Sequence, residues 1–82
     1  MEMKELKEYV CQQIGCVQNT PDDENYRKHG WVDSLGLVRL VLTLESKYGI
    51  VFTDGDVSDT AFNTIGGLVS IIGRKLEEKN HG

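Results

Sequence analysis

Apolar residues recur at helical spacing in three separate stretches of this chain. In the first, from Glu2 to about Gly15, they are three and four residues apart, while charged side chains occupy the other positions. This pattern predicts an amphipathic helix with one buried stripe. The stripe consists of Met3, Leu6, Val10, Ile14 and Val17.

The second stretch, Ser34 to about Tyr48, is apolar around most of its circumference. Gly49 follows it and is suited to a left-handed helix end. We expect the core face to consist of Leu40, Leu44 and Tyr48. A helix this apolar is either central to the fold or also presents apolar surface to another molecule. The residues expected on that second surface are Leu35, Val38 and Leu42.

The third stretch begins at Thr64 and carries a stripe formed by Ile65, Leu68, Val69, Ile72 and Leu76. Gly66 and Gly67 fall in its first turn, where each glycine costs roughly 1 kcal/mol relative to alanine. Thr64 also lacks the carboxylate partner of a capping box. We therefore predict that the start of this helix frays. Residues 77–82 are polar and are expected to form a disordered tail.

Residues 18–32 form a long connection rich in turn-forming residues, with Tyr26 and Trp31 as its large apolar side chains. We interpret Trp31 as the side chain that pins this loop to the core. Asp54 and Asp56 precede a short helix at about Val57 to Phe62. The prediction is an all-α, monomeric four-helix bundle of three main helices plus one short one. It forms a single domain over residues 1–82, with its core at about 2–76.

Thirteen acidic and nine basic residues give a net charge of −4, which disfavours nucleic acid and anionic membranes as partners. No apolar run is long enough for a membrane span, and residues 1–8 lack a hydrophobic signal core, so we expect a cytoplasmic protein. Cys11 and Cys16 lie five apart in one predicted helix and should point to different faces as reduced thiols. Neither the cysteines with His29 and His81 nor the aspartates near residue 55 have the spacing of a metal site.

The segment from His29 to Leu35 leads into the second helix. Asp33 is predicted to cap that helix, since its carboxylate can accept from the free N–H groups of the first turn. Ser34 then becomes the first helical residue, with its side chain toward solvent. Taken by themselves, Asp33 and Ser34 form an ordinary start of a helix.

The order of several segments along the chain resembles that of a known protein family. Asp33-Ser34-Leu35, the segments 38–41 and 44–50, and then Asp54, Asp56 and residues 62–68 resemble the acyl carrier and peptidyl carrier protein family over about residues 30–76. The resemblance implies that a phosphopantetheinyl transferase attaches 4'-phosphopantetheine from coenzyme A to Ser34, between Asp33 and Leu35. Cargo loaded by an acyl- or aminoacyl-activating ligase would ride on the arm as a thioester. Downstream synthase or transferase enzymes would act on it, so the chain itself is expected not to be an enzyme.

The resemblance also implies a surface for partner docking or a cargo cleft. Its expected residues are Leu35, Val38, Arg39, Leu42, Asp54 and Asp56. Gly36 and Arg39 stand where fatty-acid carriers usually have acids, which favours a specialised pathway of secondary metabolites, amino acids or modified lipids. The alternatives are a general fatty-acid carrier and a cofactor-free helical interaction module, in which Ser34 only starts the helix.

Overall fold

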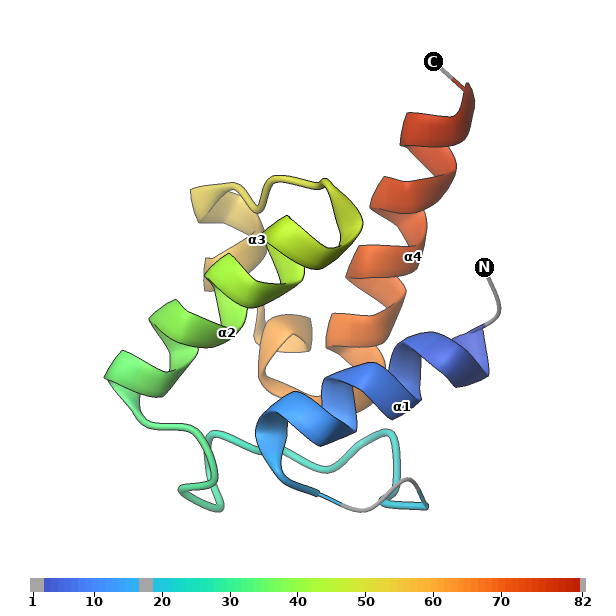
Figure 1. Cartoon of the computed structure of the whole chain (residues 1–82). Coiled ribbons are helices and arrows are strands. Elements are labelled where there is room, and N and C mark those ends of the chain that lie inside the picture. Colours follow the sequence, from blue (N-terminus) through green and yellow to red (C-terminus); the bar gives the residue numbers. More distant parts are fainter. Residues whose placement is uncertain (1–2, 17–18, 82) are drawn as a thin grey trace.

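The computed structural model describes residues 3–16 and 19–81, and its elements are all helical (Figure 1). They are α1 (Met3–Ile14), α2 (Ser34–Tyr48), α3 (Asp54–Ser58), the 3-10 helix η1 (Thr60–Asn63) and α4 (Ile65–His81). Within the described ranges there is no strand, only one isolated bridge between Asn25 and Thr64. The predicted all-α fold with three main helices and a short one is confirmed.

The core forms where the predicted apolar stripes meet. In Figure 1, α1 crosses the first half of α4, and the two helices pack directly on each other. Their fully buried side chains include Leu6, Val10, Ile65, Leu68 and Ile72. Met3, predicted as part of the stripe, is about half exposed because it lies at the open end of α1. Val17 lies outside the described residues.

The predicted core face of α2 is confirmed, since Leu40, Leu44 and Tyr48 are all buried. Gly49 ends the helix as expected, with a left-handed φ of 64° and its N–H donating to the carbonyl of Glu45. The Glu45 carboxylate then accepts from the N–H of Phe52 at 2.8 Å. This contact draws the 50–53 connection back onto α2.

The long loop is fastened to the start of α4 by a set of contacts between residues 22–26 and 62–66, which we call the loop clasp. The N–H of Gly66 donates to the carbonyl of Asp22 at 2.7 Å, and that of Ile65 donates to Glu24 at 3.2 Å. The Tyr26 hydroxyl is buried and donates to the carbonyl of Phe62. Burial raises the pKa of this hydroxyl above its ordinary range, so it stays a donor.

Trp31 does not pin the loop, contrary to the sequence prediction. Its side chain is 44% exposed and stacks on His29 with ring centroids 4.8 Å apart. The buried apolar residues in the described part of the loop are Tyr26 and Val32, which lie in the core on either side of the turn at Gly30. Tyr26 is favoured for this role because its hydroxyl finds a backbone partner when buried.

The first turn of α4 is held firmly and does not match the predicted fraying. Thr64 caps it, with its side chain accepting from the N–H of Gly67 at 3.0 Å. A side chain at Gly66 would place its Cβ 2.6 Å from that of Asp22. The glycines are therefore what allows the loop and η1 to approach this turn closely, and the fold offsets their low helix propensity.

The short helix and the chain end also differ from the prediction. Helix α3 begins earlier, at Asp54, because Thr53 and Asp56 form a capping box, and Asp59 then caps the separate helix η1. Residues 77–81 are helical rather than disordered, since α4 continues to His81. Lys79 supports this last turn by donating from Nζ to the carbonyl of Tyr48 at 3.3 Å.

The two cysteines are closer to each other than predicted. Helix α1 ends at Ile14, and Gly15 (φ 92°) turns the chain so that the N–H of Cys16 donates to the carbonyl of Cys11 at 3.0 Å. Both thiols are free. Burial, and next the hydrogen bond with Cys16, raise the pKa of Cys11 to about 12, so this thiol stays protonated near neutral pH.

Candidate functional site

Ser34 is the first residue of α2 and its side chain is exposed. Asp33 precedes it in an extended conformation, and its Oδ1 accepts from the N–H of Gly36 at 2.7 Å. The predicted cap is therefore confirmed, and the serine hydroxyl stands at the start of a helix whose first turn is already fixed.

Gly36 is part of the reason that this turn can close tightly. A Cβ at this position would lie 3.0 Å from Oδ1 of Asp33 and 3.4 Å from Cγ1 of Val32. Any larger residue would push against the capping carboxylate. The residue that departs from the acidic pattern of fatty-acid carriers thus also has a packing role here.

The surroundings of Ser34 suit an acceptor hydroxyl rather than an activated nucleophile. In the described part of the chain, the histidine nearest in sequence is His29, which contacts Glu24 and stacks on Trp31 instead. A serine nucleophile needs an adjacent base to remove its proton. The first-turn N–H groups and the positive end of the helix dipole would suit a phosphate ester on the hydroxyl. The residues present therefore fit an attached phosphodiester.

Helix α2 has a second, exposed apolar face beside this serine. Leu35, Val38 and Leu42 are 61%, 55% and 60% exposed, in contrast to the buried core stripe on the same helix. Arg39 is also exposed and borders this face. An unpartnered stripe of this kind is unusual on a small protein and typical of an interaction surface.

The two aspartates that sequence reasoning joined to this surface have different surroundings. Asp54 is exposed at the start of α3. Asp56 faces inward, where its Oδ2 pairs with Nζ of Lys75 at 2.7 Å and accepts from the N–H of Thr53 at 2.8 Å. Its side chain is only 13% exposed. Asp56 therefore joins α3 to α4 and is not presented to a partner.

Asp56→Asn should destabilise the protein at neutral pH by about 1–2 kcal/mol, since it weakens a cap and leaves Lys75 without its charge partner. The hydrogen bond from Lys75, and next that from Thr53, hold the pKa of Asp56 below its ordinary value. The stabilisation is therefore complete above about pH 4 and is lost as the pH falls through the lowered pKa. Urea unfolding at pH 7 and pH 3 should show the two proteins converging at low pH. The exposed Asp54→Asn is the matched control, and an equal loss in both variants would contradict this role.

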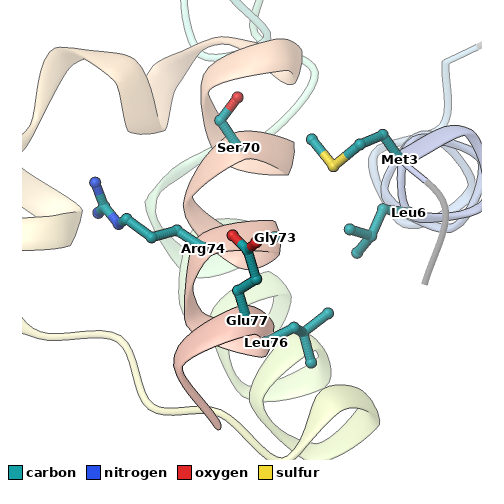
Figure 2. A pocket seen from close by; sticks show the side chains of 7 residues that line it. All are labelled: Met3, Leu6, Ser70, Gly73, Arg74, Leu76 and Glu77. Carbon is teal, nitrogen blue, oxygen red and sulfur yellow. The ribbon is translucent and has the colours of Figure 1, made fainter. Parts of the chain in front are cut away.

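Two pockets on the surface were compared as possible ligand sites. The larger, of about 520 Å³, lies between α1 and α4. Figure 2 shows Met3 and Leu6 of α1 on one side, facing Ser70, Gly73 and Glu77 of α4. The second, of about 320 Å³, lies beside the start of α2 and includes Asp33, Gly36 and Arg39 in its wall. Of these two pockets, the second is the one that adjoins Ser34, through Asp33 and Gly36.

Sequence reasoning missed two residues of the pocket beside Ser34, Gln13 and Thr43. Thr43 was recognisable as one of the few polar positions on α2. Gln13 carried no signal, because its place in the pocket depends on how the end of α1 lies against residues far along the chain.

The fold and the exposed, capped serine together define a small helical carrier domain. A family model described as a phosphopantetheine attachment site matches residues 4–72. This chain belongs to that family of acyl and peptidyl carrier domains, whose members bear covalent 4'-phosphopantetheine and are carriers rather than enzymes. A search among curated proteins gave no significant match.

Membership implies partners in general terms, namely a phosphopantetheinyl transferase and enzymes that process acyl groups. Within the ranges that the structure describes, no helix is long and apolar enough to cross a membrane. The same ranges contain no cluster of three or more His, Cys, Asp or Glu side chains placed to bind a metal ion.

Proposed function

We propose that Ser34 is the residue to which 4'-phosphopantetheine is attached, and that residues 1–82 act as one carrier domain. The observation that carries the proposal is the exposed Ser34 side chain at the first position of a helix capped by Asp33. The same residues form the Asp33-Ser34-Leu35 motif that resembles the family pattern. When bound, the arm supplies a terminal thiol that holds the cargo as a thioester.

The chain's own contribution is to present the hydroxyl and to position it. Asp33 next to the serine has its carboxylate on the N–H of Gly36, and His29 contacts Glu24, so we expect the transferase to remove the hydroxyl proton. The cap fixed by Asp33 and Gly36 holds the serine at one place relative to the exposed face of α2. Partner enzymes would then dock on Leu35, Val38 and Leu42, with Arg39 and Asp54 at the edges.

Arg39 supports a specialised pathway over general fatty-acid synthesis. Enzymes that bind acidic carriers offer basic patches, and an exposed cation at this position would repel them. Such repulsion acts mainly on association rate and on rejection of wrong partners. We therefore propose that the cargo belongs to a pathway of secondary metabolites, amino acids or modified lipids.

Intact-mass measurement after incubation with coenzyme A and a promiscuous phosphopantetheinyl transferase tests the attachment. We expect a gain of one phosphopantetheinyl group in the wild type and none in Ser34→Ala. Ser46→Ala is the matched control, because Ser46 is exposed at the other end of the same helix and should leave the gain intact. A gain that persists in Ser34→Ala, or no gain with several transferases, would contradict the proposal.

A further inference from the structure

The pocket beside Ser34 is built from polar groups rather than from an apolar cleft. It has a volume of about 320 Å³ and opens between the end of α1, the turn before Ser34 and one side of α2. The groups in its wall that can bind a polar ligand are the side chains of Gln13, Trp31, Asp33, Arg39 and Thr43. The exposed apolar face of α2, formed by Leu35, Val38 and Leu42, lies on a different side of the helix from the half-buried Thr43. The pocket and this face are therefore distinct surfaces, and Arg39 lies where they meet.

The charges in the wall favour an anion at the Arg39 side. In the part of the chain that the structure describes, no carboxylate forms an ion pair with the Arg39 guanidinium. The other charged group, Asp33, is turned toward the helix start, where Oδ1 accepts from the N–H of Gly36. A guanidinium group carries a planar set of N–H donors, and two of them can bind the two oxygens of a carboxylate at once.

A long saturated chain is a poor occupant of this space. It would remove water from Arg39, Gln13 and Thr43 without replacing the lost hydrogen bonds, which is unfavourable. A short acyl group that ends in a carboxylate would satisfy the guanidinium and place its few methylenes against the ring of Trp31.

Attachment at Ser34 brings such a group within reach. The pocket wall includes the residue before the serine and the second residue after it, Asp33 and Gly36. A short flexible tether gives an effective concentration of about 1 mM, so a contact with a Kd of about 1 mM would be half-occupied. A modest interaction is therefore sufficient.

We propose that this pocket binds the free end of a short, carboxylate-terminated acyl cargo, with Arg39 as the anion-binding residue. The proposal rests on attachment of the arm to Ser34. It goes further by naming the class of cargo and the residues that retain it.

The test loads the protein with glutaryl or pentanoyl groups, using a promiscuous transferase and the two acyl-coenzyme A thioesters. Two readouts are measured: emission of Trp31, the single tryptophan of the chain, and the half-life of the thioester in hydroxylamine. Each half-life is divided by that of the same acyl group on free pantetheine, which removes differences in intrinsic reactivity. We expect the ratio to be about two- to fourfold larger for glutaryl than for pentanoyl, with a Trp31 emission shift for glutaryl only.

Arg39→Gln should abolish both differences. Arg74→Gln removes the same charge from the α4 wall of the other pocket and should preserve them (Figure 2). Mass spectrometry of each loaded sample separates this inference from the proposed function, since failure to load at Ser34 would contradict the function itself. Equal ratios for the two acyl groups on a fully loaded protein, or a glutaryl effect that survives Arg39→Gln, would overturn the pocket assignment.

Discussion

Gly67→Ala should cost about 3 kcal/mol or more of folding free energy, a large share of the roughly 4–12 kcal/mol expected for a chain of this length. An alanine Cβ at this position would lie 1.9 Å from the carbonyl oxygen of Ala61 and 2.7 Å from Oγ1 of Thr64. Neither group can move freely. The Ala61 carbonyl accepts from the N–H of Thr64 at 3.2 Å, and Oγ1 of Thr64 accepts from the N–H of Gly67. Relief of the clash therefore requires α4 and η1 to separate.

The matched control is Gly73→Ala, two turns later in the same helix. Its Cβ would meet the thioether of Met3 at 3.1 Å, a flexible and half-exposed side chain that can move aside. Helix propensity favours alanine by about 1 kcal/mol at both positions, so the difference between the variants isolates the clash. Urea unfolding followed by circular dichroism measures it. A loss below about 1 kcal/mol for Gly67→Ala would mean that the contact between η1 and α4 is looser than the structure places it.

Leu44→Ala should cost about 2–5 kcal/mol, because it removes a fully buried side chain at the centre of the α2 core face. Leu44 belongs to a core cluster that also contains buried residues of α1, η1 and α4, and these helices cannot all move in to fill the cavity. Leu42→Ala is the matched control, since Leu42 lies on the same helix but is 60% exposed. Its substitution should change the free energy of unfolding by less than about 0.5 kcal/mol. Similar losses in the two variants would mean that the core and exposed faces of α2 are wrongly assigned.

The features predicted well from the sequence are those that depend on residues close together along the chain. The cap by Asp33, the end at Gly49 and the division of α2 into two faces all follow from local spacing. The exposed position of Ser34 follows from the same pattern. These interactions form within one helix and need no knowledge of what packs against it.

The start of α3 was misplaced although its capping box, Thr53 with Asp56, is local. Three other predictions failed because they depend on neighbours that are distant in the sequence. From the sequence, Gly67 only weakens the helix. The structure shows why glycine is needed there, because the carbonyl of Ala61 occupies the place that a Cβ would take. The sequence groups Asp56 with the docking residues, and only the position of Lys75 on α4 shows that its side chain is turned inward. Trp31 and Tyr26 are both large aromatic residues of one loop, and only the position of the Phe62 carbonyl decides which is buried.

The loop clasp has a consequence for engineering by segment exchange. Residues 22–26 meet residues 62–66 through backbone hydrogen bonds and through the side-chain hydroxyl of Tyr26, and together these contacts fix the register of this part of the loop. Residues 27–31 lead from the clasp through the turn at Gly30, and their backbone is bonded back to the clasp residues. The N–H of His29 donates to the carbonyl of Asn25 at 3.3 Å, and that of Trp31 donates to the carbonyl of Tyr26 at 3.1 Å. This segment supplies Gly30 and Trp31 to the pocket beside Ser34 and is anchored by backbone hydrogen bonds before the turn and by the Asp33 cap after it. Grafting residues 27–31 from a related carrier should alter the pocket wall while leaving the serine where it stands.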